Sequence, residues 1–408
     1  MRLTLLLSTS ALTLASAFAA APTFSKDVAS IVFNRCAECH RAGEAAPMAL
    51  TSYKEVRPWA KAIKTAVLSR RMPVWLADAA HSASFKNDRR LSQSEIDTIT
   101  AWVDSGAPEG DARQTPKMPQ FVAGWSIGTP DQVFEMVEEF AVPAEGVVPY
   151  KYFQVPSGFT EDKWIQAAEI RPGQRGVLHH IIVFVQSPAG TETASERTAG
   201  GNMLTGFAPG EQPLILAPGR AKLIKAGSTF RLQLHYTPNG KAVLDRSKFG
   251  VIFAKQAPAI QAITGSAINF AFKIPAGADN HEVKSSYTAK VDTDILGFMP
   301  HMHVRGKDFK YTVTRVDGSQ EVVLTVPRYD FNWQLSYELK TPIKLNKGDR
   351  IDCVAHFDNS TNNKYNPDPT KDVKWGDQTW EEMMIGFFTY TIPGPAASSV
   401  TQSAVEQE

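Results

Sequence analysis

The sequence lacks an excess of charge of either sign. Its 43 lysine and arginine residues nearly balance 42 aspartate and glutamate residues, which gives a formal net charge of +1 over 408 residues. Without a basic excess, nucleic acid is not an expected partner, and no block of like charge suggests an interaction tail. A chain of this length exceeds one ordinary core, so we expect about two or three domains.

Long hydrophobic runs are missing as well, except at the N-terminus. Residues 1–19, MRLTLLLSTSALTLASAFA, contain one arginine, a short apolar run and small residues at the end. This pattern is typical of a secretory signal peptide and is too short to span a bilayer well. No later segment approaches a membrane span, so we expect an exported protein that does not cross the membrane.

Cysteine is scarce, with three residues in the whole chain. Exported proteins usually pair their cysteines in disulfides, but Cys36 and Cys39 are close neighbours and Cys353 is alone. The pair lies in CAECH, the attachment signature of a c-type haem, in which two thioethers hold the porphyrin and His40 supplies an axial nitrogen. A zinc site would need a second Cys/His pair nearby, and a thioredoxin-like redox pair would follow a strand rather than a helical segment.

Helical periodicity surrounds this motif over residues 20–112. The segments SKDVASIVFNRC and SYKEVRPWAKAIKTAVLSR each place apolar residues on one face. Ser92 and Glu95 form a capping box for a further helix, which Gly106 ends. Helices around a haem in a region of this size resemble a class I cytochrome c. Residues 113–125 are polar and aperiodic, which predicts a linker.

The sixth iron ligand should be soft if the haem only transfers electrons, because methionine raises the haem potential. Met72, in SRRMPVW at the expected end of a helix, is favoured by the resemblance to cytochromes. Met48 is the second choice and His81 a weaker third. Either methionine could instead be an ordinary core residue.

From residue 126 the pattern changes to short alternating runs separated by proline, glycine and asparagine. This pattern is typical of antiparallel β-sandwiches. The length suits two of them, which we place at residues 126–273 and 274–396, with a short tail at 397–408. The expected fold class is therefore multidomain, with a small all-α cytochrome domain before two jelly-roll-like β-sandwiches.

Histidine is rare, with nine residues, yet five of them lie in these strand-like segments. His179 and His180 are adjacent in LHHIIVF, so both can reach one metal only at a bulge or a strand end. His235, in LQLHY, lies on the face opposite the apolar side of its strand. His301 and His303, in FMPHMHV, share one face because strand side chains alternate. Each histidine alone is more often structural, but the set together predicts a metal site.

The type of metal is suggested by two methionines. Imidazole alone suits copper, zinc, iron or nickel. Met383 and Met384 follow two acidic residues in TWEEMM, and a thioether is a poor zinc ligand but a good ligand for Cu(I). Taken alone, the methionine pair would be core packing.

The order of these motifs along the chain resembles that of the copper type II, ascorbate-dependent monooxygenases, the family of peptidylglycine α-hydroxylating and dopamine β-monooxygenases. The order is His-His, then a single His, then His-x-His, then Glu-Met. The matching segments LHHIIVF, LQLHY, HMHVRGK and EEMM are spread over most of residues 126–395. The resemblance implies two copper ions. One would store an electron on His179, His180 and His235, and the other would activate O2 on His301, His303 and Met383, the catalytic set.

Departures from this family narrow the expected substrate. Met299, Ile385 and Phe387 stand where the peptide-amidating members have an arginine, an asparagine and a tyrosine that help bind the substrate, and Met384 stands where the animal enzymes have a cysteine. A small apolar substrate is therefore expected. The haem domain is foreign to the animal enzymes, and we expect it to replace ascorbate by passing electrons from a periplasmic donor to the all-histidine copper.

The sequence thus predicts a periplasmic copper- and haem-dependent monooxygenase. A non-catalytic haem and copper electron carrier or copper-binding protein is the alternative, and such a carrier would close the catalytic copper with a fourth protein ligand such as His356. A zinc-binding sandwich is a third possibility. Otherwise His281 and His356 are predicted to be structural.

Overall fold

The computed structural model describes residues 21–42, 44, 46–78, 85–121, 124–192 and 202–395. The chain divides into two compact units. The first comprises residues 1–41, 48–69 and 91–119, and the second comprises residues 42–47, 70–90 and 120–408. The predicted signal peptide, the tail at 397–408 and His81 lie outside the described residues.

The first unit is helical, as the sequence predicts. Its elements are the π-helical turn η1 (Phe24–Val28), α1 (Ala29–Arg35), α2 (Tyr53–Val56), the 3₁₀ turns η2 (Arg57–Trp59) and η3 (Ala112–Gln114), α3 (Ala60–Leu68) and α5 (Gln93–Asp104). Pro58 lies at the start of η2, where its missing N–H separates α2 from α3. The capping box of Ser92 and Glu95 at the start of α5 is confirmed.

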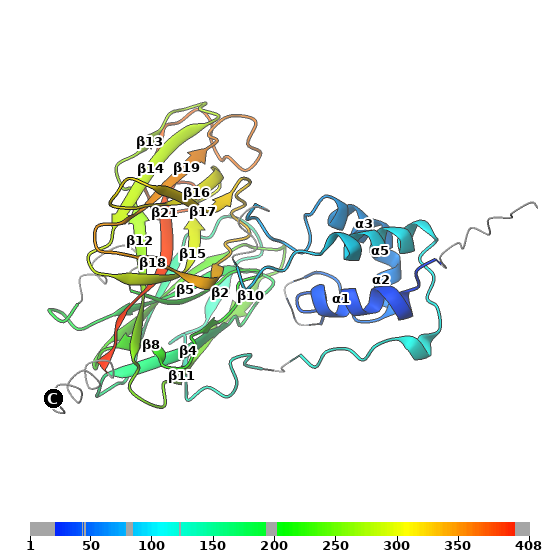
Figure 1. The fold of residues 1–408 in the computed structure, drawn as a ribbon, viewed down its shortest axis with the longest axis horizontal. Helices are drawn as coiled ribbons and strands as arrows, with labels where there is room; N and C mark the ends of the chain where they lie inside the picture. The colour runs from blue at the N-terminus through cyan, green and yellow to red at the C-terminus, as the bar shows by residue number, and fades with distance from the viewer. Residues whose placement is uncertain are drawn as a thin grey trace, which may run out of the picture. The chain divides into compact units, whose positions relative to one another are not determined.

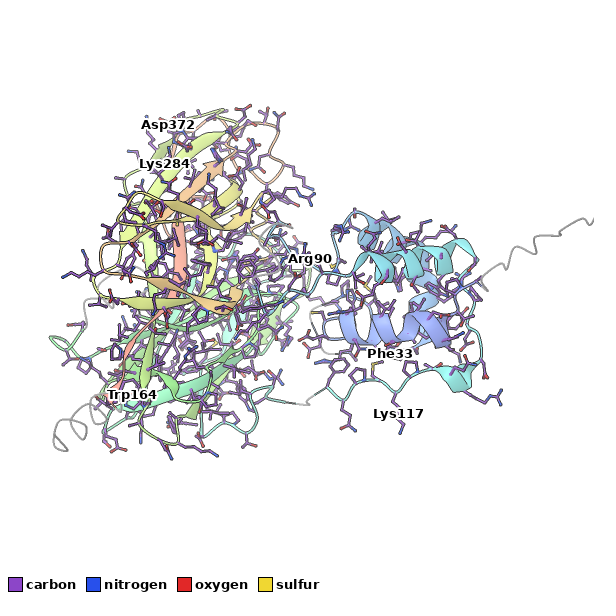
Figure 2. The ribbon with its side chains drawn as sticks, viewed as in Figure 1. Phe33, Arg90, Lys117, Trp164, Lys284 and Asp372 are labelled. Atoms are coloured by element: carbon purple, nitrogen blue, oxygen red, sulfur yellow. The ribbon has the colours of Figure 1, made fainter. Side chains whose placement is uncertain are left out.

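A single apolar core holds these helices together. Phe24, Phe33 and Trp102 are buried in it, with the ring centroids of Phe24 and Phe33 6.0 Å apart. Figure 2 labels Phe33 on α1. Trp102 also donates its indole N–H to the carbonyl of Pro108 at 2.9 Å, which fixes the chain after α5. The helical unit therefore has a core of its own.

The second unit is built from antiparallel sheets (Figure 1). The largest has the order β1 (Gln132–Glu135), β11 (Lys248–Phe253), β4 (Lys163–Arg171), β8 (Arg220–Ile224), β12 (Ile260–Ile268), β21 (Ile385–Pro393), β15 (Thr293–His301) and β18 (Tyr337–Leu345), with β7 (Leu214–Ile215) paired to β4. Two four-stranded sheets accompany it. They are β3 (Lys151–Pro156), β9 (Thr229–Tyr236), β5 (Leu178–Gln186), β6 (Met203–Phe207), and β14 (His281–Thr288), β19 (Arg350–Phe357), β16 (Gly306–Thr314), β17 (Gln320–Val326).

Two short pairs complete the unit, β2 (Phe140–Val142) with β10 (Val243–Asp245) and β13 (Lys273–Ile274) with β20 (Val373–Lys374). Two apolar cores lie within it. The first gathers side chains from residues 134–251, among them Phe134, Phe230 and Phe249. The second gathers side chains mainly from residues 267–388, among them Phe298 and Tyr311. Each four-stranded sheet contributes alternate residues to one of these cores.

One sheet runs through both halves of this unit. Strands β8 and β12 pair in parallel at Ile260 with Arg220, and β12 continues into β21 and β15. Figure 1 shows β12, β21 and β15 side by side. The prediction of short N-terminal helices followed by antiparallel β-structure is confirmed, whereas the shared sheet was not anticipated. In the described residues no helix is long and apolar enough to cross a membrane.

Residues 70–90 belong to the β unit although the sequence places them in the haem domain. Trp75 packs on Phe85 and Tyr337, with ring centroids 6.0 and 5.0 Å away. Asn87 donates to the carbonyl of Ser336 at 2.8 Å and accepts from the N–H of Glu338. Aromatic packing and these hydrogen bonds therefore fix this segment on the second core.

Candidate metal centre

A β-bulge brings His179 and His180 to the same place. Strand β5 pairs with β9 so that Leu178 is opposite Tyr236 and His180 is opposite His235. His179 is the extra residue between these two pairs, and an extra residue redirects a side chain that would otherwise point to the opposite face. The sequence allowed a bulge or a strand end here, and the structure has the bulge, which explains how adjacent histidines can serve one site.

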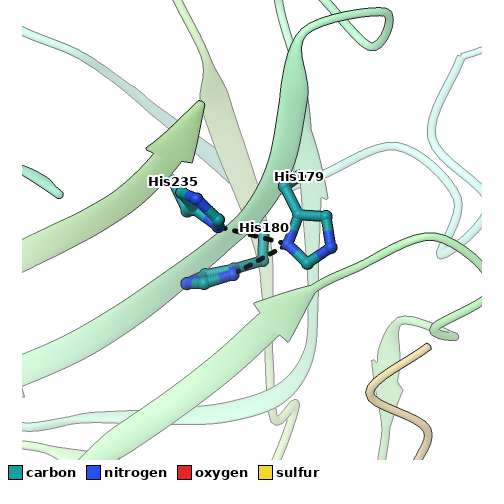
Figure 3. A group of neighbouring side chains, drawn as sticks. All are labelled: His179, His180 and His235. Atoms are coloured by element: carbon teal, nitrogen blue, oxygen red, sulfur yellow. Dashed lines mark hydrogen bonds between the residues drawn. The ribbon is translucent and has the colours of Figure 1, made fainter. Parts of the chain in front are cut away.

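The imidazoles of His179, His180 and His235 converge through their Nδ1 atoms (Figure 3). The Nδ1 of His179 lies 3.3 Å from the Nδ1 of His180 and 3.3 Å from the Nδ1 of His235. Two nitrogens bound to one tetrahedral metal at ordinary bond lengths lie about 3.3 Å apart. Both distances from His179 fit neighbouring ligands of one ion, and the ligand atoms of all three histidines lie within 4.8 Å of one another, so this cluster can bind a metal such as copper.

The three-histidine cluster is held in its uncharged, ligating form. Burial lowers the pKa of His179 to about 4 and that of His235 to about 3. Burial also lowers the pKa of His180 well below its usual value, and its Nε2 is buried without a hydrogen-bond partner. Neutral imidazoles are the form that binds metals.

A second pair of histidines lies at the end of β15. His301 is the last residue of the strand and His303 follows in the turn to β16. The sequence predicted that both histidines lie on one strand, whereas only His301 does. Their ring centroids are 5.3 Å apart and both side chains are buried. Burial lowers the pKa of His301 to about 4 and that of His303 well below its usual value.

Both rings of this pair are held at Nδ1. The Nδ1 of His301 lies 2.7 Å from the amide oxygen of Gln334, and the Nδ1 of His303 lies 3.2 Å from the carbonyl of Glu381. Each acceptor requires a proton on Nδ1, which leaves Nε2 as the ligating atom. The Nε2 of His303 is buried and has no hydrogen-bond partner. An orphaned buried nitrogen of this kind fits a metal ligand.

The buried carboxylate of Glu382 ties the histidine turn to the methionine segment. It accepts from the N–H of His303 at 2.8 Å, from that of Arg305 at 2.7 Å and from that of Met383 at 3.3 Å. Burial raises the pKa of Glu382 to about 8, against the opposing effect of these N–H groups and of the Arg305 charge. Met383 therefore lies next to the His301/His303 turn through its backbone.

The β15–β21 pairing brings the two segments together at their ends. His301 is opposite Ile385 and Met299 is opposite Phe387 in this pair. Met383 lies two residues before the last pair on one side, and His303 lies two residues after it on the other. Met384 is fully buried in the second apolar core, whereas Met383 is half-buried. The role of Met383 as a ligand stays a prediction.

Two aromatic rings lie between the two histidine groups. The ring of Phe331 stacks on His179 at 4.9 Å and lies 5.8 Å from the ring of His303. The ring of Tyr150 lies 4.9 Å from His235, 5.2 Å from His180 and 6.4 Å from His303. Both histidine groups therefore share a wall of buried aromatic side chains.

A cavity of about 410 Å³ opens beside His180 and beside residues that contact His301. His180 lines it from the first group, and Gln334 and Phe387 line it near the second, where the Phe387 ring is 6.1 Å from His301. Met299 also lines it, so the apolar side chains of Met299 and Phe387 both face this space. Ile385 does not line the cavity and is buried in β21. The cavity suits a small organic molecule.

The haem motif lies in the helical unit at the end of α1. Cys36 and Cys39 are free thiols, and the N–H groups of Cys39 and His40 donate to the carbonyl of Cys36 at 3.2 and 2.9 Å. The Nδ1 of His40 lies 3.2 Å from the carbonyl of Met48, which leaves Nε2 for an iron. Burial lowers the pKa of His40. These residues fit the attachment of a c-type haem.

The sulfur ligands proposed for this haem fall in different units. Met48 packs at the edge of the helical core, and its carbonyl oxygen lies 3.2 Å from Nδ1 of His40. Met72 lies in the second unit and packs against the second β core. Met118, which the sequence analysis passed over, also packs at the edge of the helical core. The choice of sixth ligand stays a prediction.

His356 pairs with carboxylates and not with the second histidine pair. It lies on β19, where its Nδ1 is 2.7 Å from the Asp308 carboxylate and its Nε2 is 3.7 Å from the Glu282 carboxylate. Those carboxylates account for both ring nitrogens. A role of His356 as an additional metal ligand is therefore not supported.

Sequence reasoning missed the residues that surround the ligands. Gln334, Tyr150 and Phe331 stand alone in the sequence, without a spacing that connects them to any histidine. Glu382 lies within the EEMM segment, where an acidic residue next to the proposed ligand was the available signal.

Comparisons with known proteins do not identify a relative. No family model matches the chain, and no curated protein matches it. Among solved structures, the VP2 subviral particle of infectious bursal disease virus is similar over 66% of this chain and 74% of that chain, at 9% identity and a TM-score of 0.21. Allantoicase is similar over 54% of this chain and 79% of that one, at 9% identity and a TM-score of 0.18. Similarities this low support no argument about fold or function.

Proposed function

We propose that this protein is a copper-dependent monooxygenase that hydroxylates a C–H bond of a small molecule. The observation that carries the proposal is the convergence of three imidazoles, with Nδ1 of His179 3.3 Å from Nδ1 of both His180 and His235, beside a second pair of buried imidazoles. The reaction would be R–H + O2 + 2 e⁻ + 2 H⁺ → R–OH + H2O. Bound copper would supply the redox chemistry for O2 activation.

The residues present fit two copper sites of different character. His179, His180 and His235 would hold one ion through nitrogen alone. His301, His303 and Met383 would hold the other, and the thioether would favour Cu(I), the state that meets O2. His356 pairs with the Asp308 carboxylate at 2.7 Å, so it is not placed as the fourth ligand that a closed carrier site would use. This supports an enzyme over a carrier that closes its copper with His356.

Electrons would pass between the sites by way of the protein. The shared aromatic wall of Tyr150 and Phe331 is buried and lies against imidazoles of both sets. We propose that it carries electrons from the all-histidine site to the methionine site. The c-type haem held by Cys36, Cys39 and His40 would receive electrons from a periplasmic donor.

The protein would act in the periplasm, since residues 1–19 carry the signal-peptide pattern and a c-type haem is attached outside the cytoplasm. The apolar residues Met299 and Phe387 on the cavity wall support a substrate with an apolar body.

The test is O2 consumption by protein that has been loaded with copper and reduced by ascorbate. We expect substrate-dependent O2 uptake with one hydroxylated product per O2, and its loss in Met383→Leu with the three-histidine copper retained. Met384→Leu is the matched control, because Met384 lies in the apolar core. Equal O2 uptake with and without substrate, or zinc as the bound metal in freshly isolated protein, would reject the monooxygenase.

A further inference from the structure

A lysine ammonium is buried in the wall of the cavity beside the histidines. Lys222 lies on β8, is 7% exposed and lines the 410 Å³ cavity with His180 and Phe387. We propose that Lys222 binds the anionic group of the substrate, so that the substrate is a small amphiphilic carboxylate with an apolar body. The inference rests on the proposed function, because it names the substrate class of that site.

The ammonium is held in place by neutral groups. Its Nζ donates to the carbonyls of Met203 and Leu204 and to the hydroxyl of Thr264, each at 2.9 Å. Three acceptors match the three N–H groups of an ammonium. The side chain therefore has a fixed position at the junction of β6, β8 and β12.

The positive charge has no compensating carboxylate. In the part of the chain that the structure describes, no aspartate or glutamate pairs with Lys222, whereas Lys86 on the same cavity wall is paired with Glu338 at 2.6 Å. Burial lowers the pKa of Lys222 to about 7. A buried charge without a partner is costly, and an anion that enters the cavity would remove that cost.

The cavity offers an apolar surface for the rest of such a molecule. Leu204, Met299 and Phe387 line it together with Lys222. A carboxylate at Lys222 would leave the apolar body of the molecule along these side chains, toward His180 and the second histidine pair.

A purely structural role makes a different prediction. If Lys222 only connects β6 to β8 and β12 through its three hydrogen bonds, then its charge should not affect ligand choice. The test therefore uses two ligands that differ in charge and are otherwise alike, 4-phenylbutanoate and 4-phenylbutanamide. Their dissociation constants are measured by calorimetry on the full-length, haem- and copper-loaded protein.

We expect the carboxylate to bind about 10-fold to 100-fold more tightly than the amide. The three N–H groups of Lys222 are already bonded, so the gain comes from the attraction between the anion and the unpaired buried charge. Lys222→Met should abolish this preference, and Lys222→Arg should retain it. Lys225→Met is the matched control, because Lys225 lies just beyond the same strand and does not line the cavity. Equal affinities in the natural protein, or a preference that persists in Lys222→Met, would overturn the proposal.

A second measurement needs no variant. Acetylation of Lys222 by an amine-selective reagent, followed by mass spectrometry, should be suppressed by 4-phenylbutanoate and not by 4-phenylbutanamide. Equal suppression by both compounds would count against the proposal. If the carboxylate binds more tightly but no substrate-dependent O2 uptake is seen, the anion site stands and the monooxygenase is rejected. If both compounds are hydroxylated equally, the monooxygenase stands and the anion site is rejected.

Discussion

At the scale of single residues, the orientation of His301 depends on Gln334. The amide oxygen of Gln334 lies 2.7 Å from Nδ1 of His301 and is buried with it. We expect Gln334→Met to weaken copper binding at the second site by about 10-fold to 100-fold, because partners of ligating histidines contribute this much to affinity. Competition with a Cu(I) chelator would measure it.

Gln233→Met is the control for that variant, since Gln233 is also buried but donates to the hydroxyl of Tyr152. It should leave the second copper unchanged. Unchanged affinity in Gln334→Met would show that the His301 ring is fixed by packing alone.

Glu382 acts on the backbone that carries a ligand. Its carboxylate accepts from the N–H groups of His303 and Arg305, and an amide in its place would turn an NH2 group toward one of these donors. We expect Glu382→Gln to reduce the free energy of unfolding by about 1–3 kcal/mol. Denaturant titration of the metal-free protein would measure it.

The comparison for Glu382→Gln is Glu321→Gln, at an exposed position on β17. That variant should change the free energy of unfolding very little. If the two variants unfold alike, Glu382 does not hold the turn.

At the scale of secondary structure, part of the site could be predicted from residue order. Adjacent histidines in an apolar run require a bulge if both are to meet one metal, and β5 contains it at His179. Local rules also sufficed for the capping box of Ser92 and Glu95. These features depend on residues near one another in the chain.

Long-range pairing could not be predicted in the same way. The parallel contact of β8 with β12, which joins the two halves of the β unit, connects Arg220 to Ile260 and has no local signature. The burial of Lys222 could not be predicted either, because its sequence context is that of an ordinary strand lysine and its hydrogen-bond partners come from the distant strands β6 and β12. Burial by distant strands decides the role of such residues.

The aromatic wall between the histidine groups belongs to this scale, because it joins elements from both halves. Phe331→Leu keeps an apolar side chain but removes the ring that stacks on His179 at 4.9 Å. We expect a severalfold slower electron transfer from the all-histidine copper to the other, with both copper ions retained. Rapid-freeze electron paramagnetic resonance after mixing with a reductant would measure the rate.

Phe134→Leu is a suitable control for that variant, since the Phe134 ring stacks on Phe249 at 5.0 Å within the first apolar core. Its transfer rate should match that of the natural protein. An unchanged rate in Phe331→Leu would place the electron path elsewhere.

At the scale of the whole molecule, the proposal combines two units with separate roles. The helical unit contains the haem motif with a core of its own, and the β unit contains both histidine groups and the cavity. We expect reduced haem to be re-oxidised as copper is reduced in stopped-flow mixing. Haem that stays reduced throughout would end the proposed relay.

The central claim is that one chain binds two copper ions at different ligand sets together with one covalent haem. The most direct measurement is copper and haem content per chain of periplasmic protein, for the natural sequence and for His235→Ala and Met383→Ala. We predict two copper ions and one haem in the natural protein, with one copper lost and the haem retained in each variant. Copper content that is unaffected by both substitutions, or zinc in place of copper, would contradict the claim.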